Sequence, residues 1–174
     1  DETYLDRRED LAALSDHVAA GHIDPGSFLH QHVELSAIGA IGHSLGGYTV
    51  LGLAGARRSW HDPRVRAVLG LSPYVAPYLR AGVDGTVDVP AMLQGGTFDV
   101  GITPDLPAFH ARLRAARYLL VLRAENHLGW TNLASLGRDT LQAVAQGNPR
   151  WIVGYAAAFF DRHLRGIDRA RVLE

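Results

Sequence analysis

The chain has 174 residues, of which 47% are apolar and 20% charged, so its composition is that of one folded domain and excludes the class of disordered proteins. Its 17 basic and 18 acidic residues give a net charge of −1, which excludes the basic surface expected of a nucleic-acid-binding protein. The absence of cysteine excludes disulfides, thiolate nucleophiles and cysteine-based zinc sites. No apolar run reaches the roughly 18 residues that a membrane span needs.

The first part of the chain predicts a helix, a turn and a strand. Residues 4–20 carry leucine and valine near helical spacing among charged residues, which predicts an amphipathic helix that ends at Gly21. The Asp-Pro-Gly sequence at residues 24–26 predicts a turn. Residues 37–41 are apolar without alternation, which is the pattern of a strand buried on both faces, as in a parallel sheet.

Three later runs of the same character predict strands over residues 65–71, 89–93 and 118–122. Helical stretches are expected over residues 45–56 and 106–116, between these strands. After the last strand come a segment around residues 133–145 and a final helix with a wide apolar face over residues 151–164. This alternation predicts a single α/β domain over residues 1–174, with about four parallel strands flanked by helices.

A Gly-His-Ser-Leu-Gly motif at residues 42–46 lies between the first predicted strand and the helical stretch that follows it. A serine at such a turn holds its hydroxyl above the sheet edge, and small residues two before and two after it avoid a clash. Ser44 is therefore the expected nucleophile, and the Leu45 N–H is expected to donate to the oxyanion. The alternative is a glycine-rich turn with an incidental serine. A nucleotide site is not expected, because the glycines match no phosphate-binding motif.

A serine nucleophile needs a base to take its proton and a carboxylate to orient that base. Asp99 follows the strand predicted at residues 89–93, and His127 follows the strand predicted at residues 118–122. Both therefore lie beyond the carboxyl ends of parallel strands, on the side of the sheet where Ser44 also lies. The chain order of serine, acid and histidine is the order that α/β-hydrolases use. The sequence thus predicts Ser44, Asp99 and His127 as one catalytic group.

Other ionisable residues near these loops are weaker candidates. Asp88 precedes its strand and so lies on the wrong side of the sheet, while Asp105 stands at the expected start of the next helix. Glu125 is left open between a solvated side chain and one that helps to orient the loop. His43 is expected beneath the turn and outside the catalytic group.

Two further sets of residues keep more than one interpretation. His30 and His32 form a His-x-His pair, but no third ligand is identifiable, so they are expected to be polar loop residues rather than a metal site. Trp130, Phe98 and Tyr74 each lie near a strand-end loop. They are candidates for the wall of an acyl or aromatic pocket, and core packing is the alternative for each.

Three loop segments resemble the dienelactone-hydrolase and platelet-activating-factor-acetylhydrolase-like branch of α/β-hydrolases, with cutinase-like polyester hydrolases as relatives. They are Gly-His-Ser-Leu-Gly-Gly-Tyr at residues 42–48, Gly-Gly-Thr-Phe-Asp at residues 95–99 and Glu-Asn-His-Leu-Gly-Trp at residues 125–130. Residues 158–166 are similar to the closing helix of that branch. The resemblance covers nearly the whole chain and implies an α/β-hydrolase fold.

The resemblance also implies hydrolysis of a carboxylic ester through an acyl-enzyme, with no metal or organic cofactor. It makes Ser44 the nucleophile, Asp99 the orienting acid, His127 the base and the Leu45 N–H an oxyanion donor. The substrate is then a small or polymeric ester. The open alternatives are another acyl bond (lactone, thioester or amide) and a non-catalytic binding module on the same fold.

The family has about eight strands, whereas this chain is predicted to begin at the helix before the fifth. It then corresponds to the C-terminal half of the fold, without the loop that supplies the second oxyanion N–H. We expect a fragment of a longer enzyme, which would leave the strand at residues 37–41 with an unpaired edge. The alternatives are a homodimer through that edge and a small hydrolase with a rearranged oxyanion site. The chain opens with Asp1 rather than methionine, and its cellular location is left open.

Overall fold

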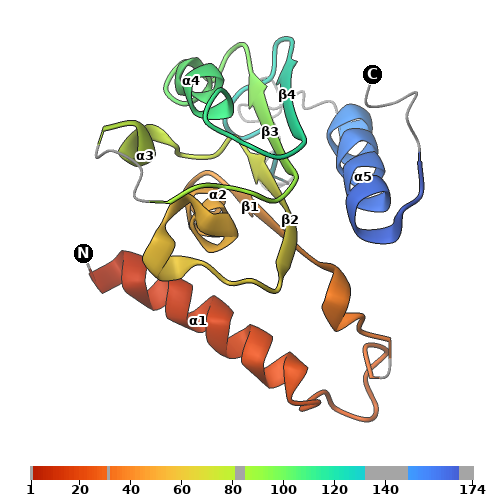
Figure 1. Cartoon of the computed structure of the whole chain (residues 1–174). Coiled ribbons are helices and arrows are strands. Elements are labelled where there is room, and N and C mark those ends of the chain that lie inside the picture. The colour runs from red at the N-terminus through yellow and green to blue at the C-terminus, as the bar shows by residue number, and fades with distance from the viewer. Residues whose placement is uncertain (1, 31, 81–84, 132–148, 169–174) are drawn as a thin grey trace, which may run out of the picture.

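A computed structural model describes residues 2–30, 32–80, 85–131 and 149–168 of the chain. In these residues one parallel sheet runs in the order β1 (Ile38–His43), β2 (Val65–Leu71), β3 (Ala91–Gly96) and β4 (Arg117–Leu122). The strands are adjacent in chain order, as expected when a helix connects each strand to the next. The predicted α/β fold with four parallel strands is therefore confirmed (Figure 1).

The helices cover both faces of this sheet. On one side lie α2 (Leu45–Leu51), α3 (Ala76–Arg80) and α4 (Leu106–His110), while α5 (Pro149–Arg165) lies on the other side (Figure 1). The helix α1 (Glu2–Ala19) precedes the sheet, and a π-helical turn at Gly52–Ala56 extends α2. Short 3₁₀ turns occur at Leu35–Ala37, Arg58–Trp60 and Thr103–Asp105. None of the helices in the described ranges combines the length and apolar character needed to cross a membrane.

The predicted elements match these bounds with one clear exception. The strand over residues 65–71 has the predicted ends, while β3 begins two residues later than predicted and continues to Gly96. The helix predicted over residues 106–116 is too long, because α4 ends at His110. There the backbone turns, and the Leu113 N–H donates to the His110 carbonyl while the Leu113 side chain is buried in the core. The segment around residues 133–145 lies outside the described residues.

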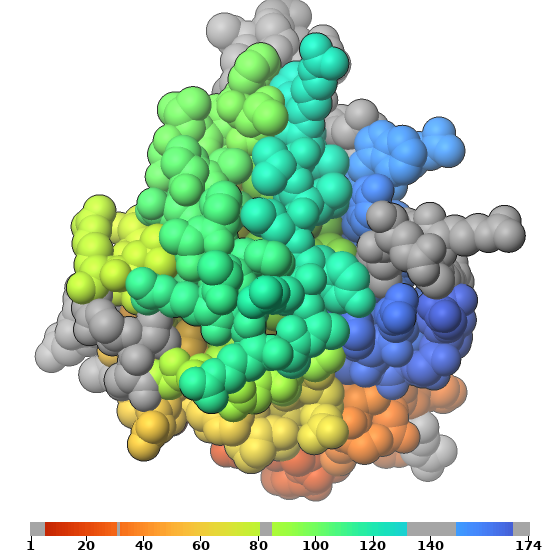
Figure 2. All heavy atoms as spheres, turned by 45° about the horizontal axis from the view of Figure 1, so that its top comes forward, coloured from red at the N-terminus to blue at the C-terminus, as the bar shows by residue number. Residues whose placement is uncertain are grey.

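Alternating residues of the inner strands pack on opposite sides of the sheet. Val68 and Leu93 lie in the cluster formed with α2 and α4, whereas Leu69 and Met92 lie in the cluster formed with Phe159 of α5. This is the two-residue period of a strand that is covered on both faces. In Figure 2 the top of Figure 1 is turned toward the viewer, and the residues of β3, α4 and β4 (green to teal) lie beside those of α5 (blue).

The strand β1 is not buried on both faces, so that prediction is wrong. β1 lies at one edge of the described sheet and pairs only with β2, which leaves Ile41 52% exposed. The helix α1 is anchored nearby by an ion pair of 2.7 Å between Asp16 and Arg64. A mostly apolar groove of about 370 Å³ separates α1 from β1, with Leu14 and Val18 on the helix side. In the part of the chain that the structure describes, the outer edge of β1 pairs with no other strand, as expected.

Replacing Phe159 by Ala should lower the free energy of unfolding by about 3–5 kcal/mol, because its ring is completely buried between α5 and the sheet. The matched control is Val153→Ala, since Val153 lies on the exposed face of the same helix and is 63% exposed. That change should stay within about 0.5 kcal/mol of the parent. Urea unfolding followed by circular dichroism measures both. Equal losses in the two variants would contradict the packing of α5 described above.

Candidate active site

Ser44 lies at a sharp turn between β1 and α2. Its backbone has φ 53° and ψ −116°, outside the helical and strand regions. The Ser44 N–H donates to the Leu71 carbonyl at 3.0 Å, and the Ser44 carbonyl accepts from the N–H groups of Tyr48 at 3.1 Å and Tyr74 at 2.9 Å. The bonds to Leu71 and Tyr74 join the turn to the end of β2, and the bond from Tyr48 belongs to the first turn of α2. They therefore hold an unfavourable backbone conformation in place.

The glycines around Ser44 do not all have the same role. A Cβ on Gly42 would collide with the backbone of Gly46, so this position must stay glycine for the turn to close. A Cβ on Gly46 would have no neighbour within 4 Å, and the expectation that a side chain there would clash is wrong. A Cβ on Gly47 would lie 2.5 Å from the Pro73 Cβ. The crowded positions are therefore Gly42 and Gly47.

The structure brings together the three side chains that the sequence singled out. His127 Nε2 lies 2.9 Å from Ser44 Oγ, and His127 Nδ1 lies 2.8 Å from Asp99 Oδ2. Asp99 is only 5% exposed, while the His127 side chain is 34% exposed. A carboxylate can only accept, so Nδ1 carries the proton and Nε2 is free to accept from the serine hydroxyl. This arrangement can make a serine nucleophilic.

Hydrogen bonds between the loops after β3 and β4 hold Asp99 and His127 in register. The Phe98 N–H donates to the Glu125 carbonyl at 2.9 Å, and the Ala124 N–H donates to Thr97 Oγ1 at 2.8 Å. Each bond links a residue one or two positions before Asp99 with a residue two or three positions before His127. The separation of the carboxylate and the imidazole is thus set by the backbone of both loops.

Glu125 is not solvated, so that alternative is wrong. The residue is 2% exposed and packs against Gly96 and Gly129, where a Cβ at either glycine would collide with it. The absence of side chains at these glycines leaves the space that Glu125 fills beneath the loop of His127. Its location fits the other alternative, a residue that helps to orient this loop.

His43 is half-buried beside the same loop. Its Nε2 lies 2.8 Å from the His127 carbonyl, and the two rings are 4.7 Å apart. Since a carbonyl only accepts, His43 Nε2 donates this bond. Burial lowers the pKa of His43 below its ordinary value of 6.5, so the neutral ring is favoured next to His127. His43 therefore supports the backbone of His127.

Ser72 is a member of this cluster that the sequence reasoning missed. It directly follows β2, is completely buried, and donates its hydroxyl to Asp99 Oδ2. Its Oγ also lies 3.2 Å from His127 Nδ1. The signal in the sequence was its place after a predicted strand, at the edge of the sheet that was already assigned to the other three residues.

Backbone strain is concentrated at this edge. Among the described residues, the non-glycine residues with positive φ are Ser44 at 53°, Ser72 at 43° and Ala124 at 61°. Each follows the carboxyl end of a strand, after β1, β2 and β4 respectively. Positive φ is costly for residues with a Cβ and is retained mainly where surrounding contacts impose it, often at functional sites. Its location supports this edge as the candidate active site.

The three residues suggested for a pocket wall have different surroundings. Tyr74 packs against the core cluster next to α2, and its N–H binds the Ser44 carbonyl. Trp130 is half-buried, and its indole N–H donates to Gln94 Oε1 at 3.2 Å. Phe98 is 67% exposed beside Asp99 and is not a core residue. Tyr74 is thus partly buried against the core, and a pocket role for Tyr74, Trp130 and Phe98 stays a prediction.

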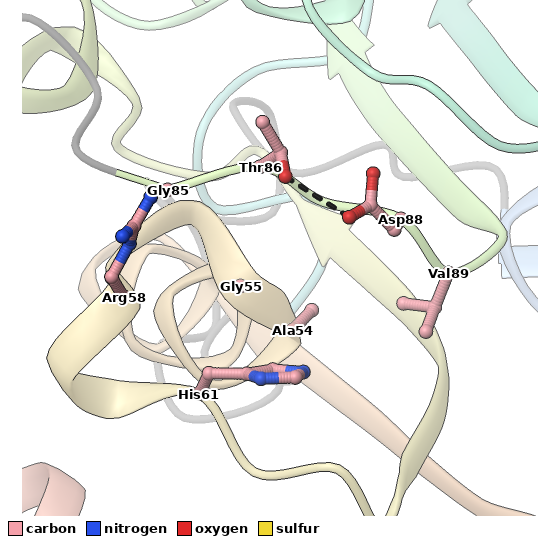
Figure 3. Close-up of a pocket in the computed structure, with 8 residues that line it drawn as sticks. All are labelled: Ala54, Gly55, Arg58, His61, Gly85, Thr86, Asp88 and Val89. Carbon is pink, nitrogen blue, oxygen red and sulfur yellow. Dashed lines mark hydrogen bonds between the residues drawn. The ribbon is translucent and has the colours of Figure 1, made fainter.

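A separate pocket of about 370 Å³ lies at the other end of the strands, where β2 and β3 begin (Figure 3). Arg58 and His61, which follow α2, border it on one side, and Thr86 and Asp88, which precede β3, border it on the other. Thr86 Oγ1 donates to Asp88 Oδ2 at 3.0 Å. Since Asp88 precedes its strand, it lies away from the carboxyl-end loops, as predicted.

The remaining acidic and histidine candidates have local roles. Asp105 is the residue before the first turn of α4, as expected for a helix start. His30 Nδ1 lies 3.2 Å from the Ile23 carbonyl, and His32 Nδ1 lies 2.8 Å from the His30 carbonyl. Both belong to the loop between α1 and β1. In the described ranges, no group of three His, Asp or Glu side chains is placed to hold a metal ion.

No protein-family model matches this sequence, and no curated protein matches it either. Solved structures do match it. A ferulic acid esterase from Streptomyces cinnamoneus has a TM-score of 0.70 at 22% identity, over 99% of this chain and 52% of that chain. An α/β-hydrolase from a Medee basin deep-sea metagenome library has a TM-score of 0.56 at 17% identity, over 93% of this chain and 64% of that chain. A dienelactone hydrolase from Anabaena variabilis has a TM-score of 0.49 at 23% identity, over 80% and 54%.

The chain has the fold of α/β-hydrolases, as the resemblance of its loop segments predicted. This assignment rests on the first two of these structures. The chain spans about half the length of the ferulic acid esterase. At these identities the comparisons establish the fold, and the chemistry has to be argued from the site.

Gly42→Ala should disrupt the turn at Ser44, because the new methyl group would meet the backbone of Gly46. We expect a loss of about 3 kcal/mol or more in the free energy of unfolding. The matched control is Gly46→Ala, whose methyl group has open space and which should be neutral or stabilising by up to about 1 kcal/mol. Thermal and urea unfolding measure both. Similar effects in the two variants would show that the turn does not close as described.

Lowering the pH from about 7.5 to about 5 should destabilise the chain through His43. Because burial lowers the pKa of His43, the folded chain binds fewer protons than the unfolded chain, and stability is lost as the pH falls below 6.5. His43→Gln keeps an N–H donor without this titration, so it should reduce the pH dependence of urea unfolding. It should not remove it, since burial also lowers the pKa of His110 and of His163. An unchanged pH dependence in His43→Gln would contradict this assignment.

Proposed function

We propose that the chain carries the catalytic group of a serine hydrolase that cleaves carboxylic esters through an acyl-enzyme. The observation that carries the proposal is the continuous line of hydrogen bonds from Ser44 Oγ to His127 Nε2 and from His127 Nδ1 to Asp99 Oδ2. Each residue lies after a different strand, and the chain order is that of an α/β-hydrolase. The roles are nucleophile for Ser44, base for His127 and orienting acid for Asp99.

The proposed reaction has two halves. In the first, His127 Nε2 takes the proton of Ser44 as Oγ attacks the ester carbonyl carbon, and Asp99 stabilises the resulting imidazolium. The tetrahedral adduct then expels the alcohol, which receives its proton from His127. In the second half, His127 activates a water molecule that attacks the acyl group and restores Ser44. We propose that the Leu45 N–H, at the first position of α2, donates to the oxyanion in both halves.

The choice of a carboxylic ester is supported by the comparisons more than by the site. A serine, a histidine and an aspartate can also cleave lactones, thioesters and amides. The ferulic acid esterase is an esterase by name and matches nearly the whole of this chain. We therefore propose ester hydrolysis, with residues 1–174 acting as one domain, and place the chain in the dienelactone-hydrolase-like branch that its loop segments resemble. No bound metal or organic cofactor enters the proposed steps.

Ser44→Ala should lower the rate of p-nitrophenyl acetate hydrolysis by about 10³-fold or more, because it removes the attacking oxygen. The parent chain should react with a fluorophosphonate probe, and peptide mapping should find the label on Ser44. The matched control is Ser36→Ala, since Ser36 is an exposed serine outside the site. It should keep full activity and labelling.

Two results would contradict the proposal. Hydrolysis that survives in Ser44→Ala would show that the nucleophile is another group. Absence of labelling at Ser44 in the natively folded parent chain would favour a binding module without catalysis. Comparison of aryl esters with the matching amide and thioester then identifies the bond that the site cleaves.

A further inference from the structure

We propose that Ser72 is a positioning residue of this site, whose hydroxyl orients Asp99 and selects the form of His127 that accepts a proton from Ser44. The inference rests on the proposed function and deepens it. Ser72 does not contact the reacting atoms through any bond described above. It acts through the carboxylate and the imidazole that it touches.

The backbone of Ser72 is held firmly in place. The residue is completely buried, and its N–H donates to the Gln94 carbonyl of β3 at 2.7 Å. Two residues later, the Tyr74 N–H donates to the Ser44 carbonyl at 2.9 Å. The segment thus links the turn that carries Ser44 to the strand that precedes Asp99. Its φ of 43° is a conformation that serine adopts only when surrounding contacts impose it.

The protons available on Ser72, Asp99 and His127 determine which group donates each hydrogen bond. An ionised Asp99 can only accept, and Ser72 has one hydroxyl proton, which it donates to Asp99 Oδ2. His127 Nδ1 lies 2.8 Å from the same oxygen and 3.2 Å from Ser72 Oγ. With its proton given to Asp99, Ser72 presents only lone pairs to Nδ1. Two acceptors therefore face Nδ1, and both favour a proton on that nitrogen.

A proton on Nδ1 of His127 also determines what the nitrogen on the other side of the ring can do. A neutral imidazole with its proton on Nδ1 has a free lone pair on Nε2, the atom that lies 2.9 Å from Ser44 Oγ. The opposite tautomer would carry a proton on Nε2 and could not act as the base. Ser72 also supplies a second donor to Asp99 Oδ2, which restrains rotation of the carboxylate. Ser72 thereby favours both the orientation of Asp99 and the tautomer of His127 that catalysis needs.

A buried serine needs a hydrogen-bond partner in any case, so the test has to separate positioning from simple burial. Ser72→Ala should lower kcat for p-nitrophenyl acetate and the rate of fluorophosphonate labelling at Ser44 by about 10–10²-fold, with KM nearly unchanged. Ser72→Cys keeps the side-chain volume with a weaker donor and should lie between Ala and the parent. The matched control is Tyr78→Phe, which removes a buried hydroxyl bond to the Tyr48 carbonyl, a bond that involves neither Asp99 nor His127. It should keep kcat.

A double-mutant cycle gives the sharper result. If Ser72 acts through Asp99, then Ser72→Ala should cost less than about threefold in a chain that already carries Asp99→Asn. In parallel, nitrogen NMR of the imidazole should show that Ser72→Ala lowers the population with the proton on Nδ1 of His127. Where Ser72→Ala does not fold, Ser72→Cys carries both measurements.

The outcomes separate this inference from the proposed function. Labelling of Ser44 that is as fast in Ser72→Ala as in Tyr78→Phe would overturn the role of Ser72 and leave the function intact. An equal loss in the presence and absence of Asp99→Asn would do the same. If the parent chain is not labelled at all, the proposed function fails, and the tautomer of His127 in the Ser72 variants still decides whether Ser72 sets the proton on Nδ1.

Discussion

The candidate site depends on the close approach of two backbone segments, where Gly42 at the end of β1 meets Gly46 in the first turn of α2. A side chain on Gly42 would not fit here, and its absence lets the chain reverse sharply and leave Ser44 at positive φ. Contacts with the end of β2 hold this conformation through the Leu71 carbonyl and the Tyr74 N–H. The position of the Ser44 hydroxyl is therefore set by the packing of the backbone around the turn.

Parallel pairing of the strands explains why the other residues join it. The carboxyl ends of all four strands lie at one edge of the sheet, so the loops after β3 and β4 come together and bond to each other. Burial of Asp99 and of Ser72 places a carboxylate and its second donor behind His127. The amino ends of the strands border a separate pocket around Arg58 and Asp88 (Figure 3). The residues proposed for catalysis thus all lie at the carboxyl ends of the strands.

The limits of the sequence patterns are visible in particular elements. The strand at residues 37–41 has the composition of a buried strand, yet β1 lies at the edge of the described sheet and Ile41 is half exposed. An apolar run indicates that a strand can be buried on both faces. How much of the strand is buried depends on the elements that pack against it. For α4, helical periodicity continued past His110, but the helix ends there and Leu113 lies buried in the core beyond it.

The sequence by itself determined the strand and helix order and the three residues that now lie together, because strand-end position and chain order are both local properties. Only the tertiary structure decided the partners that act across the chain. Ser72 and Asp99 are separated by 27 residues, and His43 and His127 by 84, so no local pattern links them. Likewise, only packing revealed that Gly42 is crowded and Gly46 is not. Contacts of this kind depend on how strands and loops approach in space, which periodicity along the chain does not specify.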